Sequence, residues 1–176
     1  MKKIFILTIT LCMVFVLTAC STKKKDEGGS GLNNLPTDNT GKQNVPQTNT
    51  KHLECNKDYS SQMTNGVTMD QDVEMDFVDD KVELMVMSMN FEMPSNLASA
   101  ADTYINTMKS TYDAKYGIYN GVTVKLERDS TTEFSIIITM DFPKISEADK
   151  ASLGMSGSQS YSVNKTAFIN QGYTCE

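Results

Sequence analysis

Apolar and polar residues alternate strictly over residues 67–77, VTMDQDVEMDF. A period of two is typical of a β-strand with one buried face. The predicted buried side holds Val67, Met69, Gln71, Val73, Met75 and Phe77, and the opposite side holds Thr68, Asp70, Asp72, Glu74 and Asp76. Asp79-Asp80 then predicts a turn, and residues 81–93, KVELMVMSMNFEM, predict the returning strand of a hairpin.

The returning strand is apolar on both of its faces. Regular pairing after a short turn places Phe77 opposite Val82, Met75 opposite Leu84, and Val73 opposite Val86, which together form a core face. The same register sends Met85, Met87, Met89 and Phe91 to the opposite face, beside the carboxylates of the neighbouring strand. A strand that is apolar on both sides indicates the centre of a sheet covered on both faces.

The pattern then changes to helical spacing. Ser95 is a predicted N-cap, apolar residues recur from Leu97 to Tyr112, and Gly117 is a predicted C-cap. A second hairpin is predicted from Val122, Val124 and Leu126 on one strand and Phe134, Ile136, Ile138, Met140 and Phe142 on the next. Residues 146–153 and 163–171 predict two short helices, each followed by glycine.

These elements predict an α+β fold in residues 51–176, a length sufficient for one hydrophobic core. We expect a single small domain with a largely antiparallel sheet of two hairpins plus edge segments, one long helix, and one or two short C-terminal helices. Residues 172–175, GYTC, could run beside the segment that holds Cys55.

The chain begins with a different kind of pattern. Residues 1–19 hold two lysines followed by an apolar run, as in a secretory signal peptide, and the run is short for the alternative of a membrane-spanning helix. Leu17-Thr18-Ala19-Cys20 resembles the lipobox of bacterial lipoproteins. The resemblance implies cleavage before Cys20 and attachment of diacylglycerol to its sulfur, and two or more acyl chains anchor a protein stably. Residues 20–50 are rich in Gly, Ser, Asn, Thr and Pro and predict a disordered tether.

Four cysteines are present, but Cys12 would leave with the signal and Cys20 would carry lipid. The remaining pair, Cys55 and Cys175, predicts a disulfide in an oxidising compartment, with two separate buried thiols as the alternative. Such a bond would close a loop of more than a hundred residues, worth about 4–5 kcal/mol in the chain-entropy model.

Charge further restricts the partners. From Lys51 onward the chain holds 10 Lys and Arg against 19 Asp and Glu, a net charge near −9. Nucleic-acid binding needs a basic face and is therefore not expected. An anionic bilayer would also repel the domain, so we expect membrane contact through the lipid on Cys20.

The chain also resembles the YehR-like group of small bacterial lipoproteins. The shared features are the lipobox ending at Cys20, the LEC sequence at residues 53–55, Asp79-Asp80-Lys81 in the hairpin, and Gly172-Tyr173-Thr174-Cys175 after a terminal helix. The resemblance covers most of residues 51–176 and implies the same architecture and paired cysteines. It implies no active site, and we expect no cofactor.

Candidate chemistry is limited. The single histidine, His52, borders the tether, where a solvated role is expected. The carboxylates Asp70, Asp72, Glu74 and Asp76 form either a solvated acidic face or a surface for a cation or a basic peptide. Met85, Met87 and Met89 are either packing residues or soft ligands for Cu(I).

We therefore expect a non-catalytic, lipid-anchored extracytoplasmic module, monomeric as a domain, that binds an unidentified protein or small ligand. A Cu(I)-handling lipoprotein using Met85, Met87 and Met89 is the alternative. An enzyme would require a pair of carboxylates in a cleft.

Overall fold

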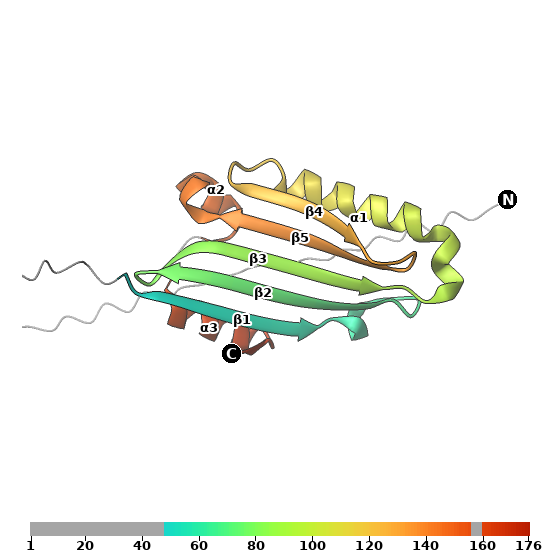
Figure 1. Cartoon of the computed structure of the whole chain (residues 1–176), viewed down its shortest axis with the longest axis horizontal. Helices are drawn as coiled ribbons and strands as arrows, with labels where there is room; N and C mark the ends of the chain where they lie inside the picture. Colours follow the sequence, from blue (N-terminus) through green and yellow to red (C-terminus); the bar gives the residue numbers. More distant parts are fainter. Residues whose placement is uncertain (1–47, 156–159) are drawn as a thin grey trace, which may run out of the picture.

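The computed structural model describes residues 48–155 and 160–176. These residues form one antiparallel sheet in the strand order β4-β5-β3-β2-β1-β6 (Figure 1). The strands are β1 (Thr50–Asp58), β2 (Thr68–Val78), β3 (Lys81–Glu92), β4 (Val122–Arg128), β5 (Glu133–Asp141) and β6 (Thr174–Cys175). The predicted α+β fold with two hairpins and edge segments is confirmed.

The turn of the β2–β3 hairpin consists of Asp79 and Asp80, as predicted. Both residues have positive φ, 49° and 63°. Positive φ at both central residues is the geometry of a type I′ turn, whose twist matches that of the flanking strands, and aspartate tolerates this conformation better than most residues. The Asp79 carboxylate also accepts a hydrogen bond from the Asn49 N–H at 3.2 Å.

The predicted register of this hairpin is correct only next to the turn. Phe77 does pair with Val82, but a β-bulge follows between Asp76 and Phe77, and Glu83 is the extra residue on β3. Beyond the bulge, Met75 pairs with Met85 and Val73 with Met87. Because one extra residue exchanges the two faces of a strand, the methionine row lies on the buried face, and Leu84 and Val86 lie on the other.

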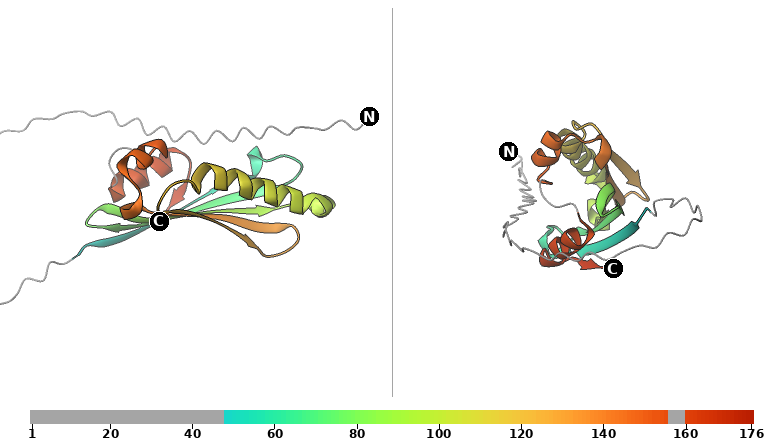
Figure 2. Two further views of the ribbon diagram at one scale, coloured as in Figure 1. Left: turned by 90° about the horizontal axis from the view of Figure 1, so that it is seen from above. Right: turned by 90° about the vertical axis from the view of Figure 1, so that its left-hand side faces the viewer.

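The helices are α1 (Ala101–Tyr116), α2 (Glu147–Ser152) and α3 (Tyr161–Asn170), with short 3-10 turns at Ser60–Gln62, Ser95–Ala100 and Phe142–Lys144. Figure 2 (left) shows α1, α2 and α3 on the same side of the sheet. The expectation that β3 is central is correct, but the described helices cover only one of its faces. We call the face without them the open face.

The predicted helix ends are partly correct. Ser146 caps α2 by accepting a hydrogen bond from the Asp149 N–H, and Gly117 is the C-cap of α1. Ser95, however, is not an N-cap: it is the first residue of a 3-10 turn whose capping position is Pro94, and α1 begins only at Ala101. The Leu97 N–H bonds to the Pro94 carbonyl, which starts the 3-10 turn one residue before the predicted cap.

The core fills the space between the sheet and the helices and is rich in methionine. The buried methionines are Met69, Met75, Met85, Met87, Met89, Met93 and Met140. From α1, Ile105, Tyr112 and Tyr116 are buried against this layer, and Phe91 stacks on Phe134 with ring centroids 4.8 Å apart. Flexible thioether side chains fill irregular space between a twisted sheet and crossing helices.

Candidate functional site

The predicted lipid-attachment residue, Cys20, lies outside the described residues, so its modification stays a prediction. So do the signal peptide at 1–19 and the tether at 20–50, apart from residues 48–50, which the structure describes, with Thr50 already in β1. Within the described residues, no helix has the length and apolar character needed to cross a membrane.

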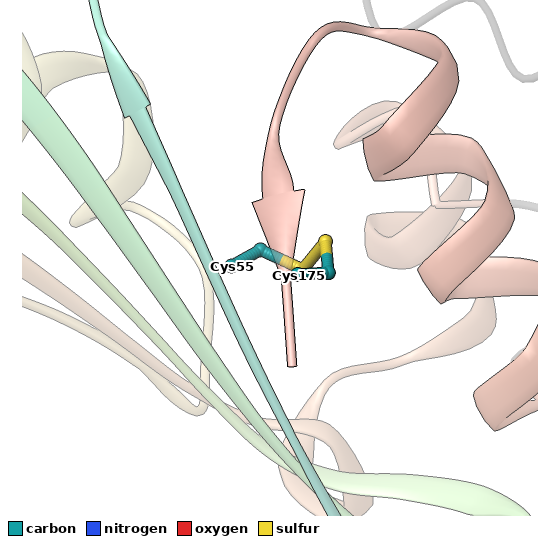
Figure 3. Close-up of a disulfide and its surroundings, with 2 residues drawn as sticks. All are labelled: Cys55 and Cys175. Atoms are coloured by element: carbon teal, nitrogen blue, oxygen red, sulfur yellow. A yellow bond between two sulfur atoms is a disulfide. The ribbon is translucent and has the colours of Figure 1, made fainter.

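The predicted disulfide joins β1 to the C-terminal strand. Cys55 and Cys175 are bonded across 120 residues of sequence, with Cα atoms 4.1 Å apart (Figure 3). The same two residues are Cα partners in the β1–β6 ladder, and the Glu176 N–H extends this pairing with a 2.9 Å bond to the Glu54 carbonyl. Lys57 adds a contact from its ammonium to the Gln171 carbonyl at 2.6 Å. The disulfide therefore fastens the segment after α3 to the edge of the sheet at β1.

The methionine row lies inside the core. Met85, Met87 and Met89 are 3%, 1% and 0% exposed. Their neighbours on β5 are Met140, Ile138 and Ile136. Successive side chains on one face of a strand are about 6.5–7 Å apart, whereas a metal–sulfur bond is about 2.3 Å long. This geometry favours packing over a Cu(I) site.

The open face is strongly acidic. Strand alternation places on it the carboxylates of Glu54, Asp58, Asp70, Asp72, Glu74, Asp76, Glu92, Glu127, Glu133 and Asp141. Lys125 lies on the same face, where it pairs with Glu127, and Lys144 pairs with Asp141. Other strand cations turn to the helix side instead. Lys51 lies over the Tyr161 ring, Lys57 lies over Tyr173, and Arg128 pairs with Asp102 of α1. The alternation predicted for β2 is confirmed, and the sheet gathers carboxylates from the other strands beside it.

Three pairs of like charges face one another directly across neighbouring strands. They are Glu54 with Glu74 and Asp58 with Asp70 between β1 and β2, and Glu92 with Glu133 between β3 and β5. Like charges in directly opposite positions destabilise a sheet. The open face therefore carries an electrostatic cost that the sequence of β2 alone does not reveal.

A hydrogen-bond network holds two carboxylates of the open face, Asp70 and Asp72, in place. The Asn90 amide donates to Asp70 at 2.8 Å and to Asp72 at 2.9 Å, and its carbonyl oxygen accepts from the Ser135 hydroxyl at 2.8 Å. Partial burial raises the pKa of Asp72, and the neighbouring Asp70 charge raises it further. A cation placed beside Asp72 would relieve this repulsion.

His52 lies on the open face between two carboxylates, and its side chain is exposed, as expected at the edge of the tether. Its Nδ1 is 2.7 Å from Asp76 and its Nε2 is 3.1 Å from Glu54. The hydrogen bond to Asp76 raises the pKa of His52, with Glu54 adding to the effect. Because the ring is bonded at both nitrogens to acceptors, it acts as a local counter-charge.

A concavity of about 250 Å³ opens on this face where β2, β1 and β6 meet. Its lining includes Glu54, Asn56, Asp72, Glu74 and Glu176. It is smaller than the roughly 300–1,000 Å³ typical of a pocket for a drug-sized ligand. No group of three or more His, Cys, Asp and Glu side chains in the described part of the chain is arranged to hold a metal ion. The space is therefore too small to enclose a drug-sized ligand.

A second, apolar pocket lies under α3 and is lined by Met75, Met85, Phe142, Met155 and Phe168 among others. Its volume is about 50 Å³. An engineered apolar cavity of about 150 Å³ is known to hold benzene. This smaller space is therefore a packing gap.

No protein-family model and no curated protein matches the chain. Among solved structures, the NMR structure of Escherichia coli YehR matches with a TM-score of 0.52 and 15% identity, over 71% of this chain and 91% of that one. The two chains share a fold. The resemblance to the YehR-like group is thereby confirmed for the architecture.

A second solved structure, from Streptococcus pneumoniae, matches with a TM-score of 0.48 and 12% identity, over 89% of this chain and 100% of that one. Neither neighbour is named for an activity. The likeness to YehR therefore gives the fold alone.

Proposed function

We propose that the chain is a lipid-anchored, extracytoplasmic and non-catalytic binding module, and that the open face of its sheet is the binding surface. The observation that carries this proposal is the asymmetry of the sheet. The helices α1, α2 and α3 all lie on one side, and the other side presents a broad acidic surface. Half-exposed Leu84, Val86 and Ile137 lie within that surface.

The extracytoplasmic location is supported by two independent features. Leu17-Thr18-Ala19-Cys20 has the lipobox pattern. A disulfide between Cys55 and Cys175 suits an oxidising environment, because cytosolic thiols are kept reduced. Neither feature depends on the other, since one lies before the domain and the other within it.

A binding role without catalysis is supported by the chemistry of the open face. The carboxylates near His52 hold its ring at both nitrogens, and no serine or cysteine nucleophile contacts it among the described residues. The carboxylates along β2 lie on a sheet surface at the regular spacing of alternate strand residues, about 6.5–7 Å.

Metabolic labelling tests the anchor. The full chain, expressed in a bacterium with a labelled fatty acid, should incorporate label and sediment with membranes. Cys20→Ala should remove both properties, whereas Cys12→Ala, which changes a cysteine within the predicted signal, should keep them. A wild-type chain that carries no fatty acid and is recovered in soluble fractions would contradict the proposal.

A further inference from the structure

The open face has the features of an interface that lacks its partner. Two of its like-charge pairs, Glu54 with Glu74 and Asp58 with Asp70, are directly opposed, with side chains about 5 Å apart at Cβ. A neutral residue at position 74 would remove the repulsion with Glu54, whereas Asp58 also accepts a hydrogen bond from the Ser60 N–H and Glu54 also contacts the His52 ring. Natural proteins break one or two such pairing rules at functional sites.

The acidic surface also borders an apolar strip. Leu84 and Val86 of β3 are half-buried on the open face, beside the carboxylates of β2. Ile137 of β5 is also half-buried on this face, one strand further from β2, with Ser88 and Lys125 as its cross-strand neighbours. Val86 is the direct cross-strand neighbour of Glu74. A ligand with cationic ends on apolar stems would match both parts of this surface, and lysine and arginine side chains have that structure.

The charge of the surface decides among possible occupants. A second copy of this chain would oppose one acidic face to another, and anionic lipid or nucleic acid would be repelled in the same way. Alternate carboxylates along β2 are about 6.5–7 Å apart, which is also the spacing of alternate side chains in an extended polypeptide. The complementary ligand is therefore a polypeptide with basic residues at every second position.

We infer that the open face binds an extended cationic polypeptide segment, whose lysine or arginine stems pack on Val86 and Ile137 while their charged ends pair with Glu74, Glu54 and Asp72. This inference rests on the proposed function and specifies the partner class of the same surface. The concavity of about 250 Å³ beside Glu54 and Glu74 has room for one such side chain. The raised pKa of Asp72 is consistent with a carboxylate that lacks a full counter-charge.

The test uses the full chain in non-ionic detergent and a fluorescent peptide in which lysine and threonine alternate. Binding is measured by fluorescence anisotropy, with protein-free micelles as the blank. Glu74→Gln should weaken binding roughly three- to fivefold, the effect of one exposed ion pair. Asp129→Asn, an equal charge change in the β4–β5 turn, should change the affinity less than about 1.5-fold.

Peptide charge, salt and urea denaturation provide further checks on this binding. A peptide alternating glutamate and threonine should not bind, and about 1 M salt, which shortens the Debye length to about 3 Å, should abolish binding of the lysine peptide. Glu74→Gln should also unfold at a higher urea concentration than wild type, so that loss of binding is not loss of fold.

Three results would overturn the inference. The first is an equal effect of Glu74→Gln and Asp129→Asn, which would reduce the binding to net charge. The second is binding that persists in high salt. The third is concentration-dependent self-association that Glu74→Gln alters while peptide affinity stays constant, which would make a second copy the occupant.

Fatty-acid labelling of the same chain separates this inference from the proposed function. A chain that carries lipid but does not bind the lysine peptide contradicts the partner class alone. A chain that binds the peptide through Glu74 but carries no lipid contradicts the membrane anchor and leaves the partner class intact.

Discussion

Replacing Gln71 with methionine should stabilise the fold. Gln71 is 0% exposed on the helix side of β2, where it lies between Lys57 of β1 and Met89 of β3. Neither its Nε2 nor its Oε1 has a hydrogen-bond partner among the described residues. A buried amide that gives up its water without gaining a partner costs free energy, and methionine offers a similar length without polar atoms.

The expected gain follows from that cost. An unsatisfied buried polar group costs about 1–3 kcal/mol, so Gln71→Met should raise the free energy of unfolding by roughly that amount. A domain of this size gains about 3–5 °C in melting temperature for each kcal/mol, which predicts a rise of roughly 3–15 °C.

Urea denaturation of the oxidised full chain measures the effect. The midpoint should rise while the m-value stays constant, because the surface exposed on unfolding is unchanged. Gln62→Met makes the same chemical change at an exposed position in a 3-10 turn and should alter stability by less than about 0.5 kcal/mol. A lower midpoint for Gln71→Met would refute the reasoning, because it would show that the amide is hydrogen-bonded in solution.

Three other predictions concern the edge and the open face of the sheet. Replacing both Cys55 and Cys175 with alanine should lower the free energy of unfolding by up to about 5 kcal/mol for a loop of 120 residues, and unfolding of the wild type with and without reductant should show a similar difference. Asp76 raises the pKa of His52 in the folded chain, so the protonated ring stabilises the fold. This stabilisation is complete below the ordinary histidine pKa of about 6.5 and is lost as the pH rises through the raised pKa. His52→Gln should therefore destabilise the chain near about pH 5.5 and have little effect near about pH 9, and an equal effect at both values would contradict the ion pair. Glu74→Gln should raise stability by about 0.2–1 kcal/mol at low salt and by less at high salt, measured by urea denaturation, and a loss of stability would show that the like-charge pair is not repulsive.

The hairpin of β2 and β3 shows how far sequence patterns predict this fold. The alternation of residues 67–77 predicts the strand and its buried side correctly, including the polar Gln71. The next strand is apolar on both faces, so its pattern does not distinguish the face of Met87 from the face of Val86. A bulge at Glu83 decides between them, and the regular pairing assumed from sequence assigns the wrong face.

The candidate site was only partly predictable for a similar reason. The acidic side of β2 is visible in the sequence, but the opposition of Glu54 to Glu74 depends on the register of β1 against β2. The same register brings His52 to Asp76, a contact between residues 24 apart. The pairing of Cys55 with Cys175 could be predicted, because their number and the expected compartment leave few alternatives.

The most direct test of the open face as the binding surface is methyl NMR of the full chain during titration with the alternating lysine–threonine peptide. Val86 and Met87 are consecutive residues whose side chains lie on opposite faces of the sheet. We predict that the methyl signals of Val86, Leu84 and Ile137 shift on binding, while that of Met87 stays in place. Shifts that gather instead on α3, at the exposed Val163 and Ile169, would contradict the account.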